Sequence, residues 1–251
     1  MRRSIGIAGS VPVDTVRRIA PLVEAAGYHA LWVNDTPGGD ALTSLAAAAA
    51  VTSTLELASG VIPLDRTGSA EIIARVRELP AERLRIGVGS GQSRHGLGLL
   101  AAGVDELRRG CDLPIVIGAL GPRTRALAAR IADGVLLSWL SPAAAADAMA
   151  DLRRDATGRP VEGVLYARSI AEAAARPALE AEAARYAGYP SYAANFARLG
   201  LDPWATTVDL TAAGAADAYA AVDELVLRAI TPTGAEDELV RLLDAGAPTR
   251  G

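Results

Sequence analysis

The sequence contains one cysteine, Cys111, and no lysine. A single cysteine excludes a disulfide within the chain and a cysteine-based metal site. The absence of lysine excludes Schiff-base catalysis and the phosphate-binding lysine of P-loop proteins. The only two histidines, His29 and His95, lie far apart and lack the spacing of zinc ligands. Zinc-dependent hydrolysis is therefore not expected, and no metal site is predicted.

The chain also lacks a basic surplus and a long uninterrupted apolar run. Its formal net charge is -4, which provides no general basic surface for a nucleic acid. No apolar stretch of membrane-spanning length is free of charge, glycine or proline, and the N-terminal run before Pro12 is too short for a signal peptide. Hydrophobic residues make up 51% of the chain, enough for a large core. These features predict a cytoplasmic protein with no nucleic-acid or membrane partner.

Eight short apolar runs recur along the chain, each followed by a helical pattern. The predicted strands are Ser4–Ala8, Ala30–Asn34, Leu55–Val61, Leu84–Val88, Pro114–Ile117, Gly134–Ser138, Val161–Ala167 and Glu224–Ala229. The predicted helices are Val13–Ala26, Ala41–Thr52, Ala70–Glu78, Leu99–Arg109, Arg123–Ala132, Pro142–Ala156, one beginning near Gly214, and Gly234–Ala245. Eight βα units in 251 residues predict one α/β domain, a (β/α)8 TIM barrel spanning residues 1–251. A doubly wound open sheet is the alternative, because periodicity does not show closure.

One gap between predicted strands, the one before the last strand, is far longer than the others. It predicts a helical insertion over residues 171–213, with helices at Ala171–Ala187 and Tyr189–Leu201. The insertion contains half of the aromatic residues of the chain, which are Tyr186, Tyr189, Tyr192, Phe196 and Trp204. Three interpretations remain open: a helical layer that packs on itself, an aromatic dimer surface, or a cover for the pocket.

The segment from Pro114 to Gly134 carries the clearest binding signal. A buried strand ends at Gly118, and Pro122 occupies the first position of the following helix. An anion could bind there, because it would meet free N–H groups, the positive end of the helix dipole and Arg123. The pattern predicts a phosphate-bearing ligand, although a glycine-rich turn can also serve only to pack a helix closely.

Other residues suited to ligand binding or catalysis follow the predicted strands, at the carboxyl end of the barrel. These tips are Asn34-Asp35-Thr36, Ser59-Gly60-Val61, Gly87 to Gln92, Gly118 to Gly121, Ser138-Trp139, Arg168-Ser169 and Arg228. Asp35 is either an acid, a base or a cap of its loop, and Trp139 is either a stacking wall for a cofactor or a lid on the barrel core. His95 could exchange a proton or be an exposed bystander.

Taken together, these tips resemble the bacterial-luciferase-like superfamily of flavin- and deazaflavin-dependent oxidoreductases. The resemblance is carried by the segments 25–35 (AAGYHALWVND), 45–64 (LAAAAAVTSTLELASGVIPL), 84–92 (LRIGVGSGQ) and 113–142 (LPIVIGALGPRTRALAARIADGVLLSWLSP). The Gly-Pro-Arg turn with the later Ala-Asp-Gly strand entry is closest to the branch that uses the deazaflavin coenzyme F420. The resemblance is clear from Ile5 to Pro142 and vague beyond.

The resemblance implies a (β/α)8 barrel with the cofactor ring in its mouth and a non-prolyl cis peptide at Ser59-Gly60 or Gly60-Val61. It implies cofactor contacts from Ser59, Gly60, Val61, Gly89, Ser90, Gln92, Gly118, Ala119, Leu120, Gly121, Pro122, Arg123 and Trp139. The implied proton-handling residue is Asp35. Many relatives have a histidine after this aspartate, whereas this chain has Thr36, which puts an alcohol-oxidising mechanism in doubt.

Three functions are consistent with this resemblance. The leading prediction is hydride transfer between F420 and a small organic substrate by a homodimer. The first alternative is an FMN-dependent monooxygenase or flavin reductase, because both cofactors carry a phosphate. The second is a degenerate barrel that binds flavin without catalysis. A non-redox sugar-phosphate isomerase ranks last, because no lysine or suitable histidine is available as its base.

Overall fold

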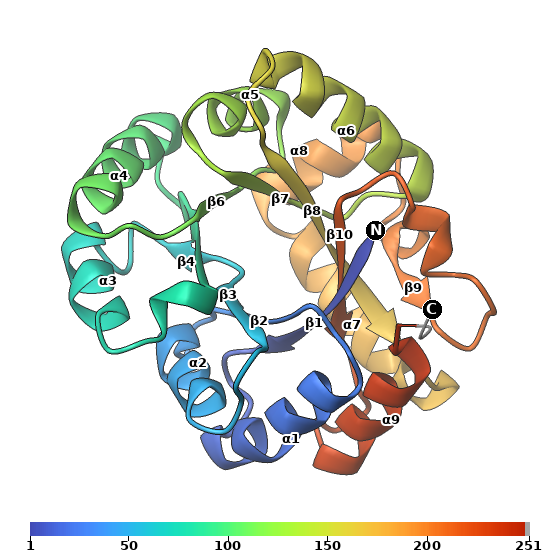
Figure 1. The fold of residues 1–251 in the computed structure, drawn as a ribbon. Coiled ribbons are helices and arrows are strands. Elements are labelled where there is room, and N and C mark those ends of the chain that lie inside the picture. The colour runs from blue at the N-terminus through green and yellow to red at the C-terminus, as the bar shows by residue number, and fades with distance from the viewer. Residues whose placement is uncertain (249–251) are drawn as a thin grey trace.

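Eight parallel strands close into a barrel in the computed structural model, which describes residues 1–248 (Figure 1). The barrel strands are β1 (Arg2–Ala8), β2 (Ala30–Asn34), β3 (Glu56–Ser59), β5 (Leu84–Gly89), β6 (Ile115–Gly118), β7 (Gly134–Ser138), β8 (Glu162–Ile170) and β10 (Glu224–Ala229). They pair in this order around the barrel, and the pairing of β10 with both β1 and β8 closes the circle. The predicted TIM barrel is therefore confirmed, and the open sheet is excluded.

Helices form the outer layer around the strands (Figure 1). They are α1 (Val13–Ala25), α2 (Ala41–Ala49), α3 (Ser69–Val76), α4 (Gly96–Gly110), α5 (Pro122–Ile131), α6 (Pro142–Ala156) and α9 (Glu236–Gly246), with α7 (Arg176–Ala187) and α8 (Pro190–Leu199) inside residues 171–213. Asp40 and Ser141 cap α2 and α6 by accepting the N–H groups of Thr43 and Ala144. Within residues 1–248, no helix combines the length and the hydrophobicity that crossing a membrane requires.

Both faces of the strands are buried, which explains their continuous apolar runs. One face packs under the helices as the main core. The other lines the interior of the barrel with Ala30, Trp32, Ala58, Val116, Leu136, Val164, Tyr166 and Val226. Side chains thus fill the barrel, and chemistry is left to the ends of the strands.

The structure corrects two local predictions and adds one short strand. The expected strand Leu55–Val61 is divided into β3 and the short β4 (Ile62–Pro63), and the Gly60-Val61 peptide between them is cis. The helix expected near Gly214 is wrong: that segment forms only a 3₁₀ turn, Asp217–Tyr219, before the chain enters β10. The structure also contains β9 (Val208–Asp209), a two-residue strand on β8 that no apolar run predicted.

Candidate active site

The start of α5 presents an open set of hydrogen-bond donors at the carboxyl end of β6. The N–H groups of Leu120, Gly121, Arg123 and Thr124 donate to no other group among residues 1–248, whereas that of Ala119 is bonded to Leu136 O at 3.0 Å. Apart from its two chain neighbours, no described residue lies within 4 Å of the place where a Cβ on Gly121 would stand. The exposed side chain of Arg123 forms no ion pair within the described chain. Free N–H groups, the helix dipole and this guanidinium can together bind an anion.

The tips of β3, β5 and β6 meet around Val61. A Cβ on Gly89 would lie 2.7 Å from Val61 Cγ2, and one on Gly118 would lie 3.2 Å from Val61 Cγ1. These two glycines therefore make room for a valine of the protein itself. The Ser59 hydroxyl is fully buried and both donates to Gly87 O (3.0 Å) and accepts from Gly87 N (2.9 Å), so it is engaged between strands. The side chain that faces any ligand here is the half-buried Val61.

The loop after β5 lies beside the loop that precedes α3. Asp65 accepts the N–H group of Gln92 at 2.7 Å, and the Gln92 side chain is exposed. Ser90 is partly exposed, and His95 directly precedes α4 with no side-chain hydrogen bond to cap that helix. These contacts hold the loop in place and leave the Gln92 carboxamide free for a ligand.

Asp35 lies at the carboxyl end of β2, and its carboxylate is held by contacts within the protein. Its carboxylate forms an ion pair with Arg66 and accepts the N–H group of Ala41, the first residue of α2, at 3.3 Å. The side chain is 10% exposed. Asp35 therefore fastens the loop between β2 and α2, which the loop-cap interpretation describes, and its carboxylate is fixed at the mouth of the barrel.

Trp139 is covered by the insertion. Its ring centroid is 5.3 Å from that of Tyr186 and 5.6 Å from that of Phe196, and the Arg168 guanidinium lies 4.1 Å from its ring. The side chain is 1% exposed, and its indole nitrogen has no hydrogen-bond partner among residues 1–248. In this conformation Trp139 is a packing residue between the barrel and the insertion. The aromatic residues of α7 and α8 thus cover part of the barrel mouth.

The same covered region contains two arginines that the sequence placed at strand ends without a role. Arg168 of β8 donates to Ser138 Oγ at 2.6 Å and to Glu182 Oε1 at 3.1 Å. Arg228 of β10 donates to Asn34 Oδ1 at 2.9 Å, and its Nη2 lies 3.9 Å from Glu182 Oε2. Burial alone would raise the pKa of Glu182, but the guanidinium groups of Arg228 and Arg168 outweigh it and lower that pKa. The signal in the sequence was an arginine near the carboxyl end of each of two buried parallel strands.

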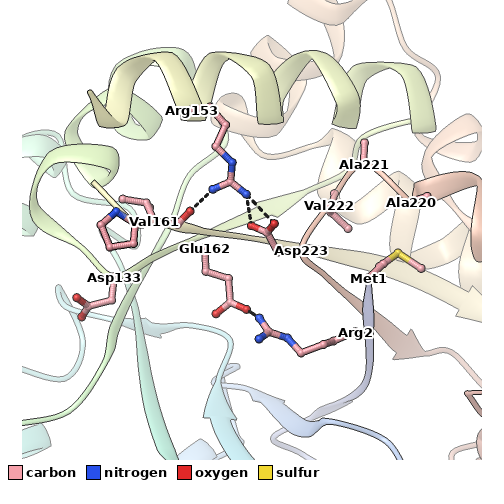
Figure 2. Close-up of a pocket in the computed structure, with 11 residues that line it drawn as sticks. Met1, Arg2, Asp133, Arg153, Val161, Glu162, Ala220, Ala221, Val222 and Asp223 are labelled. Carbon is pink, nitrogen blue, oxygen red and sulfur yellow. Dashed lines mark hydrogen bonds and ion pairs between the residues drawn. The ribbon is translucent and has the colours of Figure 1, made fainter. Parts of the chain in front are cut away.

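A large hollow lies at the opposite end of the barrel, where the strands begin (Figure 2). Its charged residues are paired within the protein: Arg2 with Glu162, Arg153 with Asp223 at 2.6 Å, and Asp133 with Arg108 at 2.9 Å; Figure 2 draws the first two pairs. A second hollow, between α7 and the 3₁₀ turn Pro203–Thr206, is lined by residues such as Ala183 and Trp204. Neither hollow contains a residue expected to contact the cofactor. We therefore retain the carboxyl ends of the strands as the candidate site.

Known folds with the same arrangement include enzymes that use different cofactors. The chain superposes on the coenzyme F420-dependent tetrahydromethanopterin reductase of Methanopyrus kandleri with a TM-score of 0.69 and 15% identity, over 98% of this chain and 99% of that one. It superposes on the monooxygenase RslO1 of Streptomyces bottropensis with a TM-score of 0.72 and 17% identity, over 98% of both chains. For the FMN-bound 3,6-diketocamphane monooxygenase of Pseudomonas putida the TM-score is 0.69 and the identity 12%, over 99% of both chains.

These identities show the fold alone, and curated protein sequences give no match. The family model of the luciferase-like monooxygenases does match, over residues 2–111 and 100–249. The two matched segments together span nearly the whole chain, including every strand of the barrel. The chain belongs to the luciferase-like monooxygenase family of oxidoreductases.

Proposed function

We propose that this protein transfers a hydride between the deazaflavin coenzyme F420 and a small organic substrate. The observation that carries the proposal is the open anion site at the start of α5, where four N–H groups and Arg123 have no partner among the described residues. A phosphate in the tail of the cofactor fits this donor set, because helix N-termini with bare glycines favour phosphate oxygens. The Gly-Pro-Arg turn at the same place is the feature that resembles the F420 branch.

The residues of the chain would bind and orient the cofactor, and the cofactor would supply the hydride chemistry. The N–H groups of Gly121 and Arg123, with the Arg123 guanidinium, would hold the phosphate. Val61, which stands among the bare tips of β5 and β6, would contact the ring. Asp35 is the proposed proton-handling group, held in position by Arg66 and by the start of α2. An Asp35→Asn variant should keep the wild-type F420 affinity and lower the turnover number; an unchanged turnover number would leave Asp35 only its loop contact.

An FMN-dependent monooxygenase is the second candidate. Two observations favour it: the matched family is described as luciferase-like monooxygenase, and one of the similar folds is an FMN complex. The anion site does not separate the two cofactors, because each carries a phosphate. The cofactor itself must therefore be identified by binding.

The test is a direct titration of the purified protein with F420, FMN and FAD, each followed by its own fluorescence. We expect saturable quenching of F420 at concentrations where FMN and FAD bind at least tenfold more weakly. Saturable binding of FMN alone would replace the proposal with the second candidate. Binding of none of the three would leave a degenerate barrel without catalysis.

A further inference from the structure

Arg168 and Arg228 form a pair of buried cations at the carboxyl ends of β8 and β10. They are register partners on adjacent strands, with exposed fractions of 3% and 8%. Among residues 1–248, Glu182 of α7 supplies the only carboxylate within 4 Å of either guanidinium group. The three side chains therefore carry one net positive charge in a buried place. Because an uncompensated buried charge is costly, this place favours a further anion.

Each guanidinium group also has a hydrogen-bond partner at the end of a barrel strand. Ser138 accepts from Arg168 Nη1, and Asn34 accepts from Arg228 Nε. The Nη2 atoms of both arginines donate no hydrogen bond to any described residue, since the 3.9 Å separation of Arg228 Nη2 from Glu182 is too long for one. Each arginine thus has a donor left for the oxygen of a ligand.

Two further buried donors near this pair have no hydrogen-bond partner in the described part of the chain. They are the indole nitrogen of Trp139 and the hydroxyl group of Tyr166, and both side chains are at most 2% exposed. The Arg168 guanidinium lies 4.1 Å from the Trp139 ring and 5.9 Å from the Tyr166 ring. Leaving such groups unpaired costs free energy, which a ligand that accepts hydrogen bonds would recover.

The arginine pair is joined to the strand tip where the ring of the cofactor is proposed to lie. Asn34 accepts from Arg228 and donates to Gly60 O, the carbonyl group of the cis peptide. The anion site for the cofactor tail lies elsewhere, at the start of α5. An anion held by Arg168 and Arg228 would therefore belong to the substrate and not to the tail of the cofactor.

We propose that Arg168 and Arg228 bind the carboxylate of an anionic substrate, and that Glu182 occupies this subsite when the substrate is absent. That this anion is the substrate rests on the proposed function, whereas anion binding by the arginine pair needs only the chain itself. Glu182 belongs to the insertion, so a competing carboxylate would release α7 from its ion pairs with the barrel. The insertion then acts as a cover that an anionic substrate displaces.

The test uses propionate as a minimal carboxylate and propionamide as its neutral counterpart, at equal ionic strength adjusted with NaCl. Binding is measured by calorimetry on the cofactor-free protein. We expect Glu182→Gln to bind propionate at least tenfold more tightly than the wild type, because the internal competitor is removed. Glu180→Gln, an exposed change on the same helix, should leave the affinity unchanged. Adding Arg168→Gln to the Glu182→Gln variant should abolish binding.

Equal propionate affinity in Glu182→Gln and Glu180→Gln, or equal binding of propionamide, would overturn the proposal. If Glu182→Gln does not fold, hydrogen exchange of the wild type replaces it: propionate should increase amide exchange in α7, and NaCl alone should not. No change in α7 would also overturn the proposal. Because these measurements use no cofactor, their failure is distinct from a failure of F420 to bind.

Discussion

Arg123 is the one side chain at the start of α5 that can add a full charge to the proposed phosphate site. It is exposed and has no ion pair and no side-chain hydrogen bond within residues 1–248, so its replacement breaks neither kind of contact there. A ligand effect of Arg123 can therefore be measured without a confounding loss of stability.

We expect Arg123→Gln to weaken binding of the cofactor by about 1.5–3 kcal/mol, the usual contribution of a hydrogen bond to a charged group. The dissociation constant should rise roughly 10- to 150-fold, as measured by fluorescence quenching of F420. Arg130→Gln, at the exposed last turn of the same helix, is the control and should change nothing. Equal dissociation constants in the two variants would remove Arg123 from the site.

The sequence predicted the roles of single residues where local backbone geometry determines them. It did not predict side-chain contacts that depend on tertiary packing. The bare turn at Gly121 and the free Arg123 could be predicted, because proline, glycine and a helix start fix the local geometry. Sequence alone could not show that Gly89 leaves space for Val61, or that Trp139 is covered by helices about fifty residues later. Such contacts depend on the tertiary arrangement, which a local pattern does not contain.

At the scale of elements, Glu24 joins α1 to the loop before β3. Its Oε1 accepts the N–H groups of Ser53, Thr54 and Leu55 at 2.6–2.9 Å. These bonds, the one from the Thr54 N–H foremost, lower the pKa of Glu24 to about 2 against the opposing effect of burial. The carboxylate is thus preferred in the folded state.

Because the folded-state pKa lies below the unfolded value of 4.5, Glu24 stabilises the protein above pH 4.5. This contribution should disappear as the pH falls from about 4.5 to about 2. With solvent screening included, we expect Glu24→Gln to lower the free energy of unfolding by about 1–2 kcal/mol at pH 7. Urea denaturation at pH 7 and pH 3 measures this difference, with the exposed Glu78→Gln as control. A difference between the Glu24 variant and the wild type that does not shrink at pH 3 would contradict the assignment.

Elements with long apolar patterns were predictable, and the irregular ones were not. The strand Ala30–Asn34 and the helix Pro142–Ala156 have the predicted bounds. Burial defines the strand, and Ser141 with Pro142 defines the start of the helix. The alanine-rich segment after Gly214 has high helix propensity, yet only nine residues separate that glycine from β10. Tyr219 there is buried and donates to Leu140 O at 3.1 Å, which favours a single 3₁₀ turn over a helix. Tertiary packing outweighs propensity in such short segments.

For the whole molecule, a charged network closes the barrel where its strands begin. Glu224 of β10 is fully buried. Its Oε1 accepts hydrogen bonds from Ser4 Oγ on β1 and from Trp32 Nε1 on β2, each at 2.6 Å. Its Oε2 accepts from Arg85 Nη1 on β5 at 2.8 Å. Burial alone would raise the pKa of Glu224, but Arg85 and the hydrogen bonds lower it. One carboxylate thus connects strands that lie on different sides of the barrel.

Replacing Glu224 alone should lower the free energy of unfolding more than replacing both Glu224 and Arg85. Glu224→Met leaves the Arg85 guanidinium buried without its main counter-charge, and we expect a loss of about 3–5 kcal/mol in the free energy of unfolding. The double variant Arg85→Met/Glu224→Met removes both charges and should recover part of that loss, because apolar side chains can fill the space that a buried pair occupied. Asp105→Ala, which breaks the exposed pair with Arg109, is the control and should cost at most about 0.5 kcal/mol. Urea denaturation of the wild type and the three variants compares these losses; a double variant less stable than Glu224→Met would show that Arg85 stabilises the barrel by packing and not through its charge.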